Sequence, residues 1–459
     1  MPRKTVLYGT VLALFSTPAL AGGPEGFADI AESASPAVVT VLTEGGTNET
    51  DQFGPNDPNR EFFERFFGDR GVPFAMPGRP QPRNGLGSGF IIDEDGIIVT
   101  NNHVIEGADQ ITVVLEDGQR LEATLIGADE KTDLAVLEVE AAVDLPTIEF
   151  GQTDDLRVGD WVVAVGNPFG IGATVTAGIV SALSRDIHAG PYDDFIQVDA
   201  PINRGNSGGP LIDGDGDVVG VNTAIFSPSG GNVGIGFAIP AELAERVVAD
   251  LIDDGQVERG WIGVGIQTVT PDIAESLGLE VAEGALIVNV TPDSPAARAD
   301  LQVGDVILSF GATEIETLRD LTRIVADQPA GTDIGLTVWR NGAETDLNLE
   351  VGQLQDERVA GLPEPSGDEN PSTLASLGLE VTEMSGSVVV TDVAPTGPAS
   401  RQGVQQGDVI ARLGTEQIGS IDDLMAGLDA AKAEGDTNVL VLVERDGNAR
   451  FLTFDLTVS

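Results

Sequence analysis

Short apolar runs rich in β-branched residues alternate with turn residues through the centre of the chain. Residues 89–92 and 97–100 are separated by Asp93-Glu94-Asp95-Gly96, and another run is followed by Glu116-Asp117-Gly118. Closely spaced strands joined by such turns predict an antiparallel barrel or sandwich, so a mostly β fold is expected. The pattern continues at residues 111–115, 134–139, 161–165, 174–183, 195–200, 218–225 and 233–239.

The hydrophobic period changes at Pro240. Residues 240–252 place apolar side chains at helical spacing, and Gly255 follows soon after. Proline at the start and glycine just past the end are the usual limits of a helix. A helix is therefore expected to close the β domain, which we place at residues 22–258.

A long segment before these strands, residues 47–84, mixes Pro, Gly, Asn and charged residues with Phe62, Phe63, Phe66 and Phe67. A loop of this length is usually a lid, a binding loop or a linker. A solvated linker gains nothing from four aromatic rings, which favours contacts with another subunit.

The C-terminal half contains an internal repeat. Ser276-Leu277-Gly278-Leu279 recurs as Ser376-Leu377-Gly378-Leu379, and Gly304-Asp305-Val306-Ile307 recurs as Gly407-Asp408-Val409-Ile410. Two copies of one small domain are therefore expected, at residues 259–352 and 373–459. Residues 353–372, rich in Pro, Glu, Asp and Gly, are expected to link them.

The first residues are typical of a secretory signal. Arg3 and Lys4 precede an apolar run, and Ala19-Leu20-Ala21 forms a small-x-small cleavage pattern before Gly22. Residues 1–21 are therefore predicted to be removed on export. The alternative is an uncleaved membrane anchor, but the run is too short to span a bilayer, and no stable membrane span is expected.

Composition narrows the classes of function. The formal net charge of −50 repels phosphate backbones, so no nucleic-acid partner is expected. The chain has no cysteine, which excludes thiol catalysis, disulfides and thiolate metal sites. Neither a metal nor a cofactor is expected.

The few histidines restrict the candidates for a catalytic base. The chain has two, His103 after an apolar strand and His188 in a predicted loop among Asp186, Gly190 and Pro191. We favour His103, and Asp133, which leads into the run at 134–139, as the carboxylate that orients it. Asp133 lies between histidine and serine in the order that chymotrypsin-like enzymes use.

Ser207 is the candidate nucleophile. It stands in Gly205-Asn206-Ser207-Gly208-Gly209-Pro210, where glycines allow a sharp turn that can aim backbone N–H groups at one point. Such a turn alone is weak support, but together with His103 and Asp133 it predicts a serine protease.

Four motifs resemble those of the HtrA (Do-like) family of periplasmic serine proteases with two PDZ domains. They are Thr100-Asn101-Asn102-His103-Val104, Thr132-Asp133-Leu134-Ala135-Val136, Asn203-Arg204-Gly205-Asn206-Ser207-Gly208-Gly209-Pro210 and Gly234-Ile235-Gly236-Phe237-Ala238-Ile239-Pro240. The resemblance implies a chymotrypsin-like double β-barrel followed by two α+β PDZ domains. It further implies oxyanion donors at the backbone of Gly205, Asn206 and Ser207.

The resemblance also implies a substrate-binding strand at Thr223, Ala224 and Ile225. Ile225 and Phe226 would make the specificity pocket apolar. Trypsin-like enzymes that cut after Lys or Arg carry an acid six residues before the serine, where this chain has Pro201. Cleavage after small aliphatic residues is therefore expected.

PDZ domains hold a polypeptide's terminal carboxylate on the backbone of a hydrophobic-Gly-hydrophobic loop. Trp261-Ile262-Gly263-Val264 fits this pattern, whereas counting back equally from Ser376 reaches Gly361-Leu362-Pro363-Glu364, which does not. The second repeat is therefore expected to serve assembly more than peptide capture. The expected partners are unfolded or misfolded polypeptides, apolar C-terminal peptides, and copies of this chain in a homotrimer or larger assembly. The competing hypothesis is a chaperone or scaffold that binds unfolded chains without cutting them.

Overall fold

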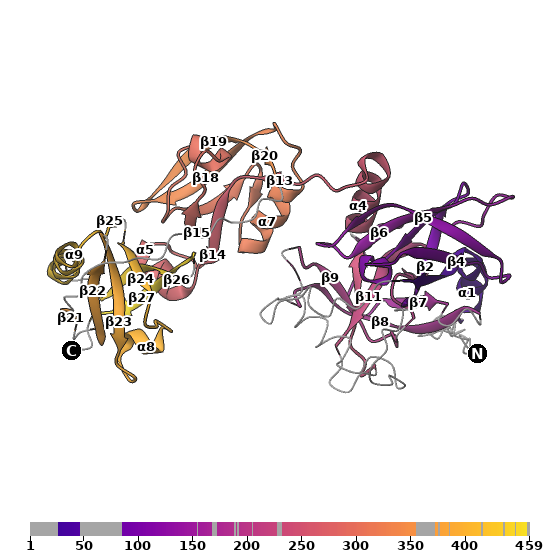
Figure 1. The fold of residues 1–459 in the computed structure, drawn as a ribbon, viewed down its shortest axis with the longest axis horizontal. Coiled ribbons are helices and arrows are strands. Elements are labelled where there is room, and N and C mark those ends of the chain that lie inside the picture. Colours follow the sequence, from indigo (N-terminus) through magenta and orange to yellow (C-terminus); the bar gives the residue numbers. More distant parts are fainter. Residues whose placement is uncertain are drawn as a thin grey trace, which may run out of the picture. The chain divides into compact units, whose positions relative to one another are not determined.

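The computed structural model describes most of the chain (Figure 1). It divides into two compact units, Met1–Ala189 with Asp193–Gln256, and Gly190–Tyr192 with Val257–Ser459. The predicted signal segment, the insertion with its phenylalanines, His188 and most of the predicted linker lie outside the described residues. Those residues are 26–45, 85–153, 155–167, 172–187, 190, 192–203, 205–226, 232–354, 372–374, 377–384, 386–414, 416–434, 437–445 and 447–456.

The first unit begins with a closed antiparallel barrel. Its strand order is β1-β2-β3-β6-β5-β4, and β1 closes the ring by pairing with both β2 and β4. Inward side chains such as Val41, Ile98 and Leu137 form its apolar core. The strands are β1 Val38–Glu44, β2 Gly85–Asp93, β3 Ile97–Thr100, β4 Gln110–Val114, β5 Arg120–Asp129 and β6 Leu134–Val139.

A second closed barrel follows, in the order β10-β11-β12-β9-β8-β7, so the predicted mostly β fold is confirmed as a double barrel. Val162, Ile196 and Leu211 lie in its core. Its strands are β7 Trp161–Gly166, β8 Thr174–Arg185, β9 Phe195–Val198, β10 Pro210–Ile212, β11 Val218–Ile225 and β12 Gly236–Pro240.

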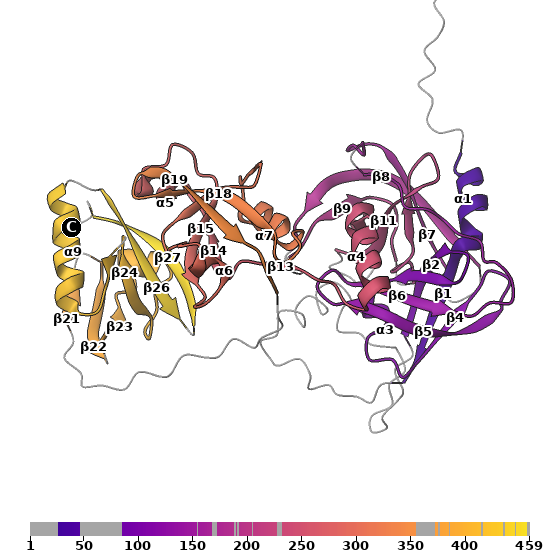
Figure 2. The ribbon, with the colours of Figure 1, turned by 90° about the horizontal axis from the view of Figure 1, so that it is seen from above.

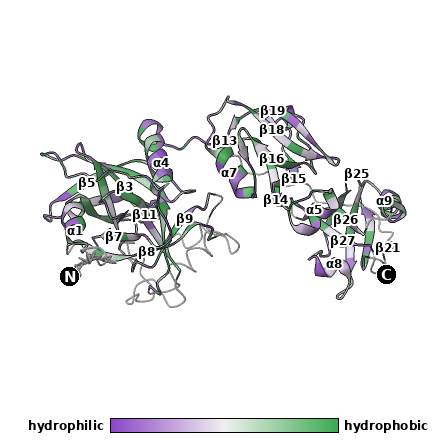
Figure 3. Cartoon of the chain, turned by 180° about the vertical axis from the view of Figure 1, so that it is seen from behind, coloured by the Kyte–Doolittle hydropathy of each residue, from purple (hydrophilic) through white to green (hydrophobic). Residues whose placement is uncertain are grey.

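Helices flank the two barrels. α4, Ala241–Asp254, ends at Gly255 in the left-handed conformation with φ 72°, as the sequence predicts. Its buried residues, including Val247 and Leu251, cover β5 and β6, and Figure 3 shows both hydrophobic and hydrophilic stretches on it. The remaining helices of this unit are α1 Ala28–Ala34, the 3₁₀ helix η1 Ser35–Ala37 and α3 Asn102–Ile105.

The second unit begins with the first repeat, a six-stranded antiparallel sheet with helices packed on it (Figure 2). A separate short pair, β13 with β20, joins the start of the repeat to its end. The elements are β13 Gly260–Trp261, β14 Val264–Thr268, α5 Pro271–Leu277, β15 Ala285–Val290, α6 Pro295–Arg298, β16 Val306–Phe310, β17 Thr313–Glu314, α7 Leu318–Ala326, β18 Asp333–Arg340, β19 Ala343–Glu350 and β20 Gly352–Gln353.

The second repeat has the same plan with one strand added at its edge. Its seven-stranded sheet has the order β21-β22-β23-β24-β26-β27, with β25 paired to β24. The elements are β21 Ser372–Leu374, β22 Leu379–Met384, β23 Ser387–Val393, α8 Pro398–Arg401, β24 Val409–Leu413, β25 Glu416–Gln417, α9 Ile421–Glu434, β26 Asn438–Arg445 and β27 Asn448–Asp455.

The two repeats pack against each other within the second unit. Leu286 and Val288 of the first repeat share an apolar cluster with Phe451 of the second. The Gln267 side chain also bonds both backbone groups of Phe451, accepting from its N–H at 2.8 Å and donating to its carbonyl at 3.0 Å.

None of the helices in the described part of the chain has the length and apolar character needed to cross a membrane.

Candidate active site

The three residues singled out as a catalytic set come from both barrels. His103 lies in the single-turn helix α3 after β3, Asp133 stands immediately before β6, and Ser207 lies in the turn before β10. The pairing of β3 with β6 places the first two side by side, since Thr100 is opposite Ala135. The structure therefore gathers residues that are far apart in sequence.

Backbone bonds fix the orientation of Asp133. Its φ of 57° lies in the left-handed region, which aspartate tolerates better than most residues. Its carbonyl accepts from the Asn102 N–H at 3.1 Å and from the Asn101 Nδ2 at 2.9 Å. These bonds to the segment before His103 aim the carboxylate at the imidazole.

The Asp133 carboxylate bonds His103 at two places. Oδ2 lies 2.7 Å and Oδ1 2.9 Å from His103 Nδ1, while Oδ1 also accepts from the His103 backbone N–H at 2.9 Å. The side chains are 13% and 27% exposed for His103 and Asp133, so water has limited access to the pair. The carboxylate thereby favours the tautomer with a proton on Nδ1, which leaves Nε2 as the basic nitrogen.

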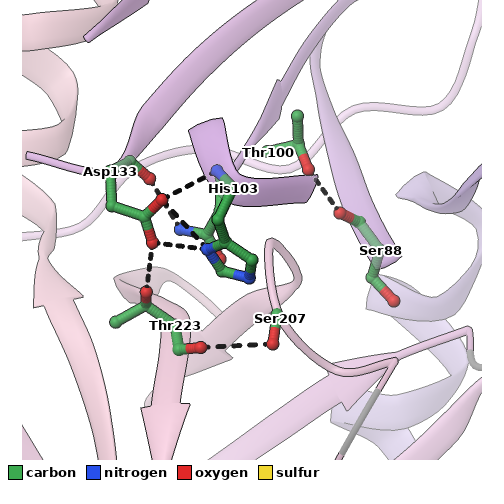
Figure 4. A network of polar contacts seen from close by, with 7 residues as sticks. Ser88, Thr100, His103, Asp133, Ser207 and Thr223 are labelled. Atoms are coloured by element: carbon green, nitrogen blue, oxygen red, sulfur yellow. Dashed lines mark hydrogen bonds and ion pairs between the residues drawn. The ribbon is translucent and has the colours of Figure 1, made fainter. Parts of the chain in front are cut away.

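Thr223 contacts both Asp133 and Ser207 (Figure 4). Its hydroxyl donates to Asp133 Oδ2 at 2.6 Å, and its carbonyl accepts from Ser207 Oγ at 3.1 Å. The sequence predicted Thr223 only as part of a substrate strand, and its hydroxyl role was missed. The sequence holds no local signal for it, because Asp133 and Thr223 meet only when the two barrels fold together.

The Ser207 turn is packed too tightly for side chains at Gly208 and Gly209. A Cβ at Gly208, where φ is 85°, would lie 2.2 Å from the Ser88 carbonyl oxygen. The Gly208 N–H donates to the Asn222 carbonyl at 2.7 Å, and the Ser207 carbonyl accepts from the Ser88 N–H at 2.8 Å. Bonds to β2 and β11 thus hold the turn on both sides.

The three backbone groups predicted as oxyanion donors differ in their partners. The Asn206 N–H donates to the Asn203 carbonyl at 3.0 Å and is engaged within its own turn. The Gly205 carbonyl accepts from the Ser88 hydroxyl at 2.5 Å, and Gly205 has φ 101°. Among the described residues, the Asn206 N–H is thus the one of the three that is seen to be engaged, and the N–H groups of Gly205 and Ser207 stay candidates for an oxyanion hole.

The predicted substrate strand lies along β11. β12 pairs with Ala224 and Ile225 on one side, whereas β10 reaches no further than Val221 on the other. Ala224 and Ile225 are buried, and Phe226 just beyond them is 48% exposed. Pro201 is exposed, with its carbonyl bonded by the Thr176 hydroxyl at 2.9 Å. β11 therefore offers a free edge next to Ser207 within the described residues.

The predicted carboxylate loop of the first repeat lies between β13 and β14. The Ile262 carbonyl accepts from the Ala296 N–H and the Gly263 carbonyl from the Thr291 N–H, each at 2.8 Å. Gly263 has φ 81°, and a Cβ there would lie 2.3 Å from the Ser294 Cβ. A glycine is therefore required at this position.

The second repeat has the equivalent loop at Leu377-Gly378-Leu379. The Leu377 carbonyl accepts from Ala399 at 3.1 Å and the Gly378 carbonyl from Ala394 at 2.9 Å, repeating the bonds of the first loop. Counting back equally from Ser376 reaches residues 361–364, which lie outside the described residues, and so misses this loop. α5 lies between β14 and β15, whereas the short turn between β22 and β23 has no helix, so equal spacing fails.

Comparison with known proteins agrees with this architecture. A trypsin-like peptidase domain matches residues 87–221, and PDZ domains match residues 260–351 and 375–456. A probable periplasmic serine endoprotease, DegP-like, from Brucella suis is 45% identical, covering 94% of this chain and 90% of that protein. The relative of the same name from Rhizobium meliloti is 44% identical, covering 94% of this chain and 92% of that protein.

Solved structures give the same result. The HtrA-type protease AlgW with a tripeptide has a TM-score of 0.61 and 41% identity, covering 72% of this chain and 98% of that one. A serine endoprotease from Yersinia pestis has a TM-score of 0.52 and 34% identity, covering 73% of this chain and all of that one, at 100%.

A trypsin-like double barrel with a Ser, His and Asp set, followed by two PDZ domains, defines a serine endoprotease. The chain belongs to the HtrA-type family of serine endoproteases, whose DegP-like members are the relatives described above. The expected family and the proteolytic function are confirmed, in preference to a scaffold that does not cut.

Proposed function

We propose that Ser207, His103 and Asp133 carry out acyl transfer on exposed segments of unfolded proteins. Ser207 Oγ attacks the scissile carbonyl carbon while His103 Nε2 takes its proton, and the imidazolium then gives that proton to the leaving amine. Water repeats the sequence to release the acyl group from Ser207. The observation that carries the proposal is the 2.7 Å contact between Asp133 Oδ2 and His103 Nδ1 beside the Ser207 turn.

The N–H groups of Gly205 and Ser207 are proposed to receive the negative oxygen that forms during attack. Removal of one such donor typically costs 10²- to 10³-fold in kcat. The Asn206 N–H takes part only if its bond to Asn203 opens.

Substrate binding is proposed to release the nucleophile. The Ser207 hydroxyl donates to the Thr223 carbonyl at 3.1 Å, and this carbonyl lies on the edge where an added substrate strand would bond. A substrate N–H that bonds the Thr223 carbonyl would replace the serine there. The hydroxyl would then turn toward His103.

The substrate preference is proposed to be for small aliphatic residues before the cleaved bond. Ile225 and Phe226 supply apolar surface, and Pro201 stands where an acid would be needed to select Lys or Arg. Mass-spectrometric mapping of cuts in a peptide library tests this preference. Cuts confined to bonds after Lys or Arg would contradict it.

The loop Trp261-Ile262-Gly263-Val264 is proposed to capture apolar C-termini, and the first residues to direct export to the periplasm. Supporting observations are the left-handed Gly263 and the periplasmic designation of the relatives. Assembly into a homotrimer or larger oligomer, through the Phe-containing insertion, belongs to the same proposal. Chaperone activity would be secondary to cleavage.

Casein cleavage by the wild type, Ser207→Ala and the exposed control Ser33→Ala tests the function. Ser33 is exposed and donates to the Ile30 carbonyl within its own helix, so Ser33→Ala should cleave as the wild type does. Ser207→Ala should lose cleavage while still retaining unfolded casein on gel filtration. Cleavage by Ser207→Ala at the wild-type rate would exclude Ser207 as the nucleophile.

A further inference from the structure

The two repeats differ at the edge strand that follows each loop. In the first repeat β14 ends the sheet, and within the described residues no strand pairs with its outer edge. In the second repeat the corresponding strand, β22, is covered by β21. The register is Ser372 opposite Val381, Thr373 opposite Glu380 and Leu374 opposite Leu379.

The correspondence of β14 with β22 rests on their pairing. β14 pairs with β15 and has a bulge between Gly265 and Ile266, and β22 pairs with β23 and has a bulge between Glu380 and Val381. Ile266 therefore corresponds to Val381. β21 occupies the edge to which a captured peptide would add as an antiparallel strand.

The N–H groups of the second loop already have an acceptor. Leu377 N and Gly378 N donate to the Leu374 carbonyl at 3.1 and 2.9 Å. Adjacent N–H groups that converge on one oxygen are the means by which such loops hold a terminal carboxylate. The Leu374 carbonyl oxygen stands where one oxygen of a ligand carboxylate would lie.

The Leu374 side chain packs among apolar side chains of β22 and α9. It is 3% exposed and belongs to a cluster with Val381 of β22 and with Leu424 and Leu428 of α9. The equivalent wall of the first repeat is more open, because Val264 and Ile266 are only partly buried. An apolar side chain thus occupies the second repeat where the first repeat has accessible surface.

We propose that the second repeat contains a binding site for an apolar polypeptide C-terminus, and that the chain's own residues Ser372–Leu374 occupy it. The proposal rests on the proposed peptide capture by these repeats and is independent of the Ser207 chemistry. An external C-terminus binds the second repeat only when β21 leaves the edge of β22.

Intramolecular occupancy sets the size of the expected effect. A short tether gives the segment Ser372–Leu374 an effective concentration of the order of millimolar at its own site. With an untethered Kd of about 10 to 100 μM for this segment, its tethered copy weakens the binding of an external peptide about 10- to 100-fold. Removing the Leu374 side chain should therefore tighten the binding of an external peptide to the second repeat at least tenfold.

The test uses the full chain with Ser207→Ala, to prevent cleavage, and Gly263→Ala, to disable the first loop. The probe is a fluorescein-labelled peptide of residues 365–374 with a free terminal carboxylate, followed by fluorescence anisotropy. We expect weak binding to this parent chain and at least tenfold tighter binding when Leu374→Ala or Leu374→Asp is added. The amidated peptide should bind none of them tightly.

A locked form supplies the matched control, since the natural chain has no cysteine. Thr373→Cys with Glu380→Cys substitutes two residues that are backbone partners across β21 and β22, so that a disulfide would lock the two strands together. In the Leu374→Ala background, oxidation should abolish the gained binding and reductant should restore it. Gained binding that survives oxidation places the peptide elsewhere and overturns the proposal.

Three further outcomes would overturn it. Tight binding by the parent chain shows that β21 does not block the site, and an absent gain in folded variants shows that no site lies beneath it. Unfolding of the second repeat in both variants, seen as lost hydrogen-exchange protection in β26, shows that Leu374 is a structural core residue. Peptide binding by the chain with Gly263 intact tests the first loop separately.

Discussion

The substitution Thr223→Val tests how the candidate active site positions its acid. Valine keeps the shape of threonine but removes the hydroxyl that donates to Asp133 Oδ2 at 2.6 Å. The carboxylate keeps the His103 backbone N–H on Oδ1 at 2.9 Å and loses one of its three donor groups. Its orientation is weakened but not abolished.

The magnitude follows from the type of bond lost. A hydrogen bond to a charged group contributes about 1.5–3 kcal/mol, and about 1.4 kcal/mol corresponds to a tenfold change in rate. We therefore expect kcat to fall about 10- to 150-fold. KM should change little, because the bond acts on the transition state more than on substrate binding.

Initial rates on a fluorogenic peptide with an aliphatic residue before the cleaved bond measure both constants. Thr337→Val is the matched control, since it removes a comparable Thr hydroxyl bond, to Asp346 at 3.0 Å, on the first PDZ repeat. It should leave kcat unchanged. An unchanged kcat in Thr223→Val, or a loss as deep as that of Asp133→Ala, would refute the reasoning.

Two further predictions concern packing and a repeated ion pair. Gly208→Ala should reduce casein cleavage more than 100-fold, because the new Cβ would lie 2.2 Å from the Ser88 carbonyl oxygen. Gly214→Ala is the control. A Cβ at Gly214 has no atom within 4 Å, so this variant should cleave casein at close to the wild-type rate. Asp305→Ala should cost about 3 kcal/mol of stability by leaving Arg340 without its buried partner at 2.7 Å, measured by hydrogen exchange of β18. Asp300→Asn, which removes the charge of a side chain that is 76% exposed and keeps a residue type that tolerates φ 61°, should change stability by less than about 0.5 kcal/mol.

The ion pairs explain part of the repeat seen in the sequence. Asp305 bonds Arg340 at 2.7 Å through both carboxylate oxygens, and Asp408 bonds Arg445 at 2.5 and 2.7 Å in the same way. The side-chain bond from Asp305 also raises the pKa of the Arg340 guanidinium. The recurring Gly-Asp and Arg motifs are therefore contact partners in each copy.

The sequence predicts elements well where buried apolar residues are contiguous. β6 and β7 fall close to their predicted limits because their side chains are mostly buried. β5 was missed, since its residues alternate between exposed and partly buried positions without an apolar run. β10 was missed because it has three residues and follows directly from the glycine turn.

Motif matching predicted His103, Asp133 and Ser207 as one set, and the structure brings Asp133 into contact with His103. It could not predict the Thr223 hydroxyl contact, which depends on how two barrels pack. It also aligned Leu277-Gly278 with Leu377-Gly378, although the first pair ends α5 and the second forms the loop before β22. Similar letters served different local structures, since glycine suits both a helix end and a loop with positive φ.

Covalent labelling with a fluorophosphonate tests the role of Ser207 most directly. The probe should add one mass increment per wild-type chain, and peptide mapping should place it on Ser207. Labelling should be absent in Ser207→Ala and strongly slowed in His103→Ala, while Ser33→Ala should label as the wild type does. A wild-type chain that cleaves casein but takes the probe at another residue, or not at all, would contradict the account.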